Sequence, residues 1–177
     1  MKLLLLDGGP ASGKNTLGTM MVHEFEKQGT KSILLDLDTY VEKQNPTWVW
    51  QDERVKSKDL ESARTNFAQD IDKYLQKDFV VIAIGERFLT QADISRFLNR
   101  LQTSPPTQLF HLSVPFSLRK QRLYRRGRHT LINLDKDQQD RDSNPKWFGY
   151  VYENSNPLEE DVVNIMKLIQ ENYGFID

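Results

Sequence analysis

The sequence contains no cysteine, which excludes disulfide bonds and cysteine-ligated metal sites. No apolar run in the sequence is long enough to span a membrane. The leucine run that begins at Leu3 already ends at Asp7. The same run is too short for the core of a signal peptide. Neither charge is in clear excess, with 24 basic and 25 acidic side chains, so the composition does not favour attraction to nucleic acid or to a membrane surface. We therefore expect a cytoplasmic protein.

Internal repeats and low-complexity segments are also absent, and 177 residues suffice for one domain with a full core. We expect a single domain over residues 1–177. The three histidines have no spacing typical of metal ligands. His23 falls in a predicted helix and His111 in a predicted strand, which favours structural roles.

Short apolar segments alternate with stretches whose apolar residues recur at helical spacing. This alternation predicts an α/β fold with a five-stranded parallel sheet and helices on both faces. In such sheets, ligands bind beyond the carboxyl ends of the strands. The predicted strands are 2–6, 33–35, 79–84, 109–114 and 148–152, and the predicted helices are 16–28, 60–75, 92–101, 116–126 and 158–172.

The most specific motif is GGPASGKNT, residues 8–16, which joins the first strand to the first helix. A glycine-rich turn before a helix can direct amide N–H groups towards nucleotide phosphates. Lys14 then brings an ammonium group near the terminal phosphates. Asn15 stands where a hydroxyl normally follows this lysine, and Thr16 comes one place later. The residues of this turn that we predict to bind ATP are Gly9, Pro10, Ala11, Ser12, Gly13, Lys14, Asn15 and Thr16.

This motif resembles the phosphate-binding loop of the adenylate kinase branch of the P-loop kinases. The resemblance implies the three-layer α/β sandwich of the P-loop NTPases, with ATP and Mg²⁺ as cofactors. It also implies a metal ion held mainly by water and phosphate oxygens. The residues expected near that metal are Asn15, Thr16, Asp36 and Glu86. A glycine-rich turn without a ligand is the alternative.

The second predicted strand runs into LLDLDTYVE, residues 34–42, which resembles a shikimate kinase signature. The resemblance implies that Asp36 supports the water shell of the metal and that Asp38 holds the acceptor. Two carboxylates two residues apart on a strand share a face, so we expect both to reach the phosphate site. A carboxylate beside an attacking hydroxyl can orient it and accept its proton. A solvated turn is the alternative.

Gly85, Glu86 and Arg87 follow the third predicted strand. P-loop proteins often hold a metal-bound water with an acidic residue near this point, and Glu86 is a displaced match. In shikimate kinases the glycines after this strand let the substrate approach the backbone, which implies the same role for Gly85. Arg87 is predicted to pair with an anionic substrate. Arg54 and Arg64 are further candidates for substrate binding. An ordinary loop is the alternative.

Six basic residues lie within residues 119–128, with no acidic residue among them. Arg119, Arg122 and Arg126 would share one helical face. The segment resembles the arginine-bearing lid of nucleotide and shikimate kinases, which implies a mobile lid around 119–146. It also implies that Arg122 and Arg126 bind ATP and stabilise the transition state. A nucleic-acid patch and a plain solvated helix are the alternatives.

Two later segments add weaker candidates. Arg141 lies where nucleotide kinases carry arginines that reach back to the phosphates, although a solvated loop is the simpler interpretation. Residues 154–160, NSNPLEE, resemble the adenine-side loop of P-loop kinases, which implies that Asn156 binds ATP. Asn156 or Ser155 is also expected to cap the last helix. The tryptophans at 48 and 50 are expected to pack rather than to stack on a ligand.

Together these features predict an ATP-dependent kinase that phosphorylates a hydroxyl of a small-molecule acceptor, as a monomer or a homodimer. The predicted catalytic residues are Lys14, Asp38, Arg122 and Arg126. One alternative is a nucleoside monophosphate kinase, which the adenylate-kinase-like loop favours. Another is a nucleotide-binding switch protein with little or no turnover, which the missing hydroxyl after Lys14 favours. The balanced charge counts against a fourth possibility, a 5′-end nucleic-acid kinase.

Overall fold

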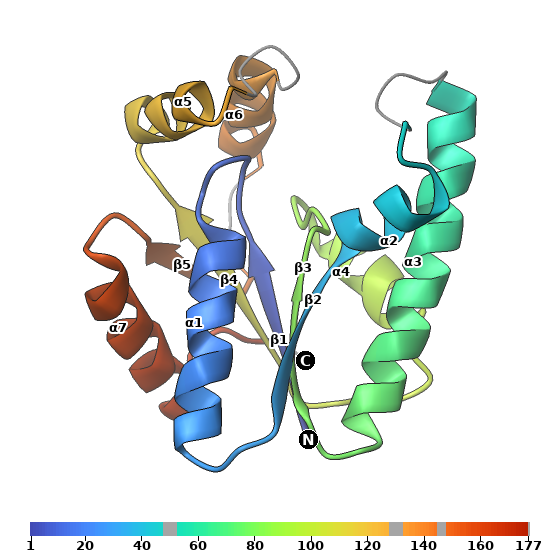
Figure 1. The fold of residues 1–177 in the computed structure, drawn as a ribbon, viewed down its shortest axis with the longest axis vertical. Helices are drawn as coiled ribbons and strands as arrows, with labels where there is room; N and C mark the ends of the chain where they lie inside the picture. The colour runs from blue at the N-terminus through green and yellow to red at the C-terminus, as the bar shows by residue number, and fades with distance from the viewer. Residues whose placement is uncertain (48–52, 128–132, 145–147, 177) are drawn as a thin grey trace.

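A computed structural model describes residues 1–47, 53–127, 133–144 and 148–176 (Figure 1). At its centre is a parallel sheet with the strand order β2–β3–β1–β4–β5, which confirms the predicted α/β fold. Helices α1 and α7 pack on one face of the sheet, and α3 and α4 pack on the other (Figure 1). The strands are β1 (Lys2–Asp7), β2 (Ser32–Asp36), β3 (Val80–Ile84), β4 (Thr107–Ser113) and β5 (Tyr150–Glu153). The helices are α1 (Lys14–Lys27), α2 (Leu37–Gln44), α3 (Glu53–Leu75), α4 (Gln91–Leu98), α5 (Phe116–Arg125), α6 (Leu134–Asp142) and α7 (Leu158–Gln170).

Strand β1 lies in the middle of the sheet, and its leucines alternate between the two faces. Leu3 and Leu5 pack with α3 and α4, whereas Leu4 and Leu6 pack with α1 and α7. All four are fully buried, as is typical of a parallel strand covered on both sides. Because β1 is central, the residues that follow it emerge in the middle of the sheet's carboxyl edge.

The end of β2 differs from the sequence prediction. The strand stops at Asp36, whose side chain caps α2 by accepting a hydrogen bond from the backbone N–H of Asp38 at 3.1 Å. Asp36 and Asp38 therefore do not share a strand face, and that part of the prediction was wrong. The physical reason is the capping preference of aspartate, which starts a helix as soon as the strand leaves the sheet.

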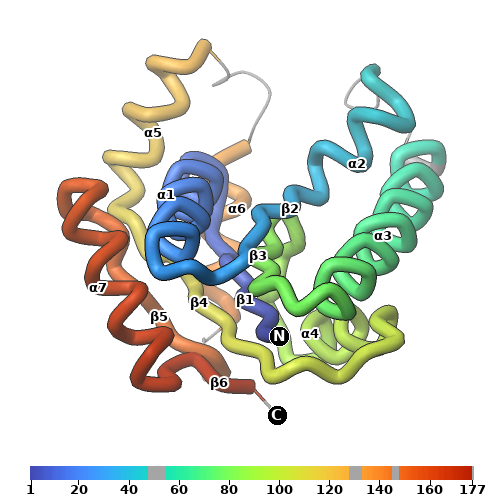
Figure 2. Tube along the Cα trace, turned by 60° about the horizontal axis from the view of Figure 1, so that its bottom comes forward, coloured from blue at the N-terminus to red at the C-terminus, as the bar shows by residue number. Residues whose placement is uncertain are grey.

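Helix α6 lies in a region for which the sequence predicted no element. Asn133 caps it by accepting from the backbone N–H of Lys136 at 2.9 Å. Only Leu134 of this helix is buried, so the apolar periodicity that reveals other helices is missing. In Figures 1 and 2, α5 and α6 rise on one side of the sheet's carboxyl end, and α2 with the start of α3 rises on the other.

The C-terminal part brings two further corrections. A two-residue strand, β6 (Phe175–Ile176), pairs antiparallel with β4 and makes the sheet six-stranded. Pro157 stands at the N-cap of α7 without a side-chain hydrogen bond, so the predicted capping by Ser155 or Asn156 was wrong. Asn156 instead donates to Asp161 Oδ1 at 3.0 Å. No helix in the described part of the chain is long and apolar enough to cross a membrane.

Candidate active site

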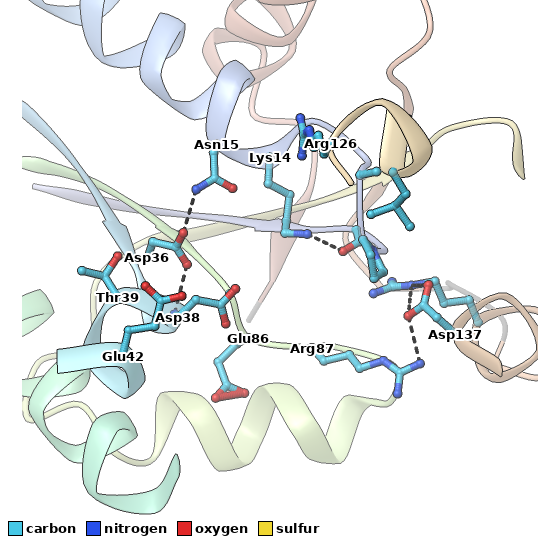
Figure 3. A pocket seen from close by; sticks show the side chains of 16 residues that line it. Lys14, Asn15, Asp36, Asp38, Thr39, Glu42, Glu86, Arg87, Arg126 and Asp137 are labelled. Carbon is cyan, nitrogen blue, oxygen red and sulfur yellow. Dashed lines mark hydrogen bonds and ion pairs between the residues drawn. The ribbon is translucent and has the colours of Figure 1, made fainter. Parts of the chain in front are cut away.

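A cavity of about 780 Å³ opens at the carboxyl end of the sheet (Figure 3). Ten predicted site residues line it: Pro10, Ala11, Lys14, Asn15, Asp36, Asp38, Gly85, Glu86, Arg87 and Arg126. Five other lining residues had not been assigned to a binding site: Gly8, Thr39, Glu42, Leu123 and Asp137. Arg141, the weaker candidate for reaching the phosphates, also lines the cavity. The predicted residues that do not line it are Gly9, Ser12, Gly13, Thr16, Arg64, Arg122 and Asn156.

The glycine-rich turn is held from outside by two side chains that bind its carbonyl groups. Arg122 Nη1 donates to the carbonyl of Ala11 at 3.3 Å, and Asn154 Nδ2 donates to that of Ser12 at 2.7 Å. Gly13 has a φ of 94° and precedes α1 directly, so the turn feeds into a helix N-terminus. The first N–H groups of a helix have no intrahelical partner and are suited to bind an anion.

Lys14 extends back over this turn. Its Nζ donates to the carbonyl oxygens of Gly8 at 2.6 Å and of Gly9 at 3.3 Å. Burial lowers the pKa of Lys14 from its ordinary value, and nearby carboxylates, Asp7 first among them, partly oppose this effect. The ammonium group therefore lies at the mouth of the turn, as expected for a group that binds phosphate oxygens.

Asn15 occupies the place of the usual hydroxyl and binds a carboxylate. Its Nδ2 donates to Asp36 Oδ2 at 2.7 Å (Figure 3). Thr16 is exposed and does not line the cavity, so its predicted role near a metal is not supported. Within the described residues, no three acidic, histidine or cysteine side chains are arranged to hold a metal ion. The carboxylates of Asp36 and Asp38 both line the cavity, and oxygen ligands of this kind suit an Mg²⁺ ion that keeps several water ligands and also binds phosphate.

Asp38 lies in the first turn of α2 and lines the cavity. Burial and the negative charges of Asp36, Glu42 and Glu86 raise the pKa of Asp38 to about 6, although Lys14 opposes them. A carboxyl group that titrates this close to neutrality is suited to accept a proton from a substrate.

Glu86 and Arg64, predicted for metal and substrate, bind each other. Arg64 Nη2 donates to Glu86 Oε2 at 3.1 Å, its Nε donates to the other oxygen, and its Nη1 donates to Glu61 at 2.7 Å. Arg64 therefore lies behind Glu86 rather than in the cavity wall. The side chain of Arg54 lies outside the described residues, as do Trp48 and Trp50.

Gly85 and Arg87 flank Glu86 and line the cavity, as predicted. Gly85 has a φ of 94°, and a Cβ there would lie 2.8 Å from Asp36 Oδ1, so only glycine fits without strain. Arg87 donates from Nη2 to Asp137 at 3.1 Å and to Asp140 at 3.0 Å. Its guanidinium group is thus directed towards α6.

Of the three arginines predicted to share a face of α5, Arg119 and Arg122 contact the glycine-rich turn. Arg119 is buried beside Gly9 and donates to Asp137 at 2.9 Å, so it does not reach the cavity. Arg122 holds the turn, and Arg126 lines the cavity.

A buried ion pair beneath this turn escaped the sequence analysis. Asp7 is fully buried, receives hydrogen bonds from Arg141 of α6, and lies 2.8 Å from His111 Nδ1. Burial alone raises the pKa of Asp7, but His111 and Arg141 outweigh that effect and hold the pKa well below its usual range. One signal in the sequence could have revealed this ion pair. Asp7 directly follows four leucines of a predicted strand, and a carboxylate buried at the end of such a strand requires a partner.

Several solved structures with a similar fold are described as kinases. The chain shares 16% identity with shikimate kinase from Aquifex aeolicus, with a TM-score of 0.66 over 97% of this chain and 98% of that chain. A sugar kinase from Janibacter sp. matches at 15% identity and a TM-score of 0.69, over 96% and 95% of the two chains. Shikimate kinase from Acinetobacter baumannii, solved with shikimate, matches at 22% identity and a TM-score of 0.62, over 97% and 93%.

The chain has the fold of the P-loop kinases. The family described as "Chromatin associated protein KTI12" also matches residues 1–85, the segment that carries the glycine-rich turn, Asp36, Asp38 and Gly85. No curated protein sequence matches the chain. In this P-loop kinase fold, the cavity described above lies at the carboxyl end of the sheet, where α/β proteins bind their ligands.

Proposed function

We propose that this protein transfers the γ-phosphoryl group of ATP to a hydroxyl of a small molecule. The observation that carries the proposal is that Lys14 and Asp38 line one cavity, with the phosphate-binding turn between β1 and α1. An ammonium group suits the phosphates, and a carboxylate with a raised pKa suits a hydroxyl that must lose its proton.

The residues on the turn side of the cavity would bind the nucleotide. The first N–H groups of α1 and the ammonium of Lys14 would bind the β- and γ-phosphate oxygens. Arg126 lines the same cavity and would neutralise charge that develops on the transferred group. Bound Mg²⁺ would supply further neutralisation of the phosphate charge, with Asp36 holding its water ligands.

The residues on the other side would bind the acceptor. Asp38 would orient the hydroxyl and take its proton as the hydroxyl oxygen bonds to the γ-phosphorus and the bond to the β–γ bridging oxygen breaks, giving ADP. The region 119–146 would act as a lid that excludes water.

A second candidate is a nucleotide-binding protein with little turnover. The contact of Asn15 with Asp36 favours this candidate. Asn15 replaces the hydroxyl that would normally lie next to the metal, and its amide is itself bound to the Asp36 carboxylate. The two candidates differ in one measurable respect, which is whether an acceptor stimulates ATP consumption.

Calorimetry with a non-hydrolysable ATP analogue and Mg²⁺, followed by an ATP-consumption assay against a panel of hydroxyl compounds, tests both. We expect the wild type to bind the analogue and at least one compound to raise turnover. Lys14→Met should lower that turnover by roughly 10²–10³-fold, the loss typical of one preorganised donor. Lys27→Met, at the far end of the same helix in an exposed ion pair with Glu24, is the matched control. Tight binding without stimulation by any compound would favour the second candidate, and no binding would refute both.

A further inference from the structure

Arg87 joins the end of β3 to α6 through its guanidinium group. Its Nη2 donates to Asp137 Oδ1 at 3.1 Å and to Asp140 Oδ2 at 3.0 Å (Figure 3). Arg87 and Asp137 both line the cavity that holds Lys14. The proposed function gives Arg87 no role, although its positive charge lies in the wall of the same cavity.

The carboxylate that Arg87 binds lies against the glycine-rich turn. A Cβ on Gly9 would overlap Asp137 Oδ2, so this side chain packs directly on the Gly9 backbone. Lys14, the ammonium group expected at the phosphates, donates to the carbonyl of the same glycine at 3.3 Å. A single carboxylate group therefore separates the Arg87 guanidinium from the turn that would bind the nucleotide.

Asp137 does not depend on Arg87 for a partner. Arg119 Nη1 donates to it at 2.9 Å and Arg141 Nε at 3.2 Å, and both of these arginines are mostly buried. The side chain of Arg87 is 42% exposed, and that of Asp140 is 36% exposed. Ion pairs with this much exposure contribute little free energy. Arg87 can therefore leave α6 without stranding a buried carboxylate, whereas Arg119 and Arg141 cannot.

A nucleotide would offer Arg87 a better partner than the aspartates. The γ-phosphate carries more negative charge than a carboxylate and has three terminal oxygens, and a guanidinium group can bind two of them at once. Of the three arginines around Asp137, Arg87 is the one able to change partners. The contact with α6 would then be a competitor that the nucleotide has to displace.

We propose that Arg87 binds the γ-phosphoryl group of the nucleotide, and that Asp137 and Asp140 hold it away from that group until the nucleotide arrives. This proposal rests on the proposed function, because it names a further residue for the same site. At the γ-phosphate, the guanidinium group would neutralise charge that develops as the phosphoryl group is transferred. The two aspartates would lower the affinity for nucleotide, because their contact with Arg87 has to be broken first.

Calorimetric titrations of the full chain with ADP and with a non-hydrolysable ATP analogue test the proposal, because the two ligands differ by the γ-phosphate. Mg²⁺ is present in both. We expect Arg87→Met to weaken binding of the analogue on the order of tenfold or more, as for a lost hydrogen bond to a charged group, and to leave ADP binding unchanged. Equal losses for the two ligands would overturn the proposal, and so would no loss for either.

Removal of the competing carboxylate should have the opposite sign. Asp140→Asn should strengthen binding of the analogue several-fold and leave ADP binding unchanged. A purely structural contact between Arg87 and α6 requires the reverse, since breaking it would disorder the cavity wall and weaken binding. The gain should also disappear when Asp140→Asn is made together with Arg87→Met, because the cation that it releases is then absent. Weaker binding in Asp140→Asn, or a gain that persists in the double variant, would refute the proposal.

Asp135→Asn is the matched control. It removes an equal charge from the same helix at an exposed position that does not line the cavity, and it should change neither affinity. A gain as large as that of Asp140→Asn would show an effect of overall charge and refute the proposal. Should Arg87→Met fail to fold, the comparison of Asp140→Asn with Asp135→Asn still decides the outcome, because both replace partly or fully exposed carboxylates.

Failure of this inference is distinguishable from failure of the proposed function. A wild type that binds the analogue and consumes ATP with an acceptor, while Arg87→Met changes nothing, would keep the kinase and exclude Arg87 from the γ-phosphate. A selective loss of the analogue in Arg87→Met without turnover for any acceptor would keep the role of Arg87 and favour the nucleotide-binding protein. A wild type that binds neither nucleotide would refute both proposals.

Discussion

Arg141 donates from Nη1 to both carboxylate oxygens of Asp7, at 3.2 and 3.1 Å. Asp7 is fully buried at the end of β1, and Arg141 belongs to α6, so the pair joins two elements that are 134 residues apart in the chain. Arg141 also binds Asp137, which in turn binds Arg119 and Arg87. Helix α6 is therefore attached to the strand that leads into the glycine-rich turn.

Removing Arg141 should destabilise the fold because it leaves a buried carboxylate with only His111 as a partner. We expect Arg141→Met to lower the free energy of unfolding by about 3 kcal/mol, as measured by urea denaturation. Arg96→Met is the control, since its partner Asp93 lies on the same helix and the pair is exposed. That variant should lose less than about 1 kcal/mol. Equal losses for the two variants would show that the Asp7–Arg141 pair does not stabilise the fold.

The parts of the fold that follow from local patterns were predictable. The four leucines of β1 have no polar residue between them, and a continuous apolar run of this kind indicates a parallel strand buried on both faces. The turn at 8–16 is recognisable because glycine and lysine occur at fixed spacing. Asp38 was correctly placed in the cavity, although on a helix rather than on a strand, because the capping by Asp36 was not anticipated.

The parts that depend on distant contacts were not predictable. Helix α6 has one buried residue and is held by ion pairs to Asp7 and Arg87, which no pattern within α6 indicates. Arg64 and Glu86 both seemed available for ligands, since their mutual contact joins residues 22 positions apart on different elements. Charged side chains that pair across the fold look the same in sequence as charged side chains in solvent.

Asn154 should determine the shape of the glycine-rich turn. Its buried amide donates to the Ser12 carbonyl at 2.7 Å and lies 2.8 Å from the position that a Cβ on Gly13 would take. Asn154→Ala leaves that carbonyl unpaired, and we expect a loss of about 1–3 kcal/mol in unfolding free energy with several-fold weaker binding of an ATP analogue.

The matched control for this experiment is Asn156→Ala. Asn156 was predicted to bind ATP, but it is exposed and its amide donates to Asp161. We expect its removal to leave nucleotide affinity unchanged in the same calorimetric titration. A larger loss of affinity in Asn156→Ala than in Asn154→Ala would restore the sequence-based assignment and remove Asn154 from the account of the turn.

Gly85 should not tolerate a side chain. In Gly85→Ala, the new Cβ would combine a φ of 94° with contacts of 2.8 Å to Asp36 Oδ1 and 2.9 Å to the backbone nitrogen of Leu37. Gly29→Ala has a comparable φ of 71° and no atom within 4 Å, so it isolates the cost of the backbone angle alone, about 1 kcal/mol. We expect Gly85→Ala to be less stable than Gly29→Ala by a further 1–3 kcal/mol or so in thermal or urea unfolding. Equal stabilities would mean that α2 moves to admit the methyl group.

Asp38 should impose a pH dependence on both activity and stability. Because its pKa is raised to about 6, phosphoryl transfer should fall as the pH drops below that value, with kcat/KM losing about tenfold per pH unit. In the unfolded chain the carboxyl returns to its ordinary, lower pKa, so between about pH 4 and 6 the folded state binds the extra proton. The unfolding free energy contributed by this group therefore declines as the pH rises through that window.

Asp38→Asn removes this contribution and separates it from the rest of the protein. At pH 7.5 the variant should be more stable than the wild type by about 1 kcal/mol. This value is reduced because the side chain of Asp38 opens into the cavity, where solvent screens its charge. Near pH 4 the variant and the wild type should be equally stable. Urea denaturation at the two pH values measures the difference. Its turnover should be low at every pH if a hydroxyl is the acceptor, because an amide cannot take the proton. Near-normal turnover would instead indicate a phosphate acceptor, which carries its own negative charge and requires no base.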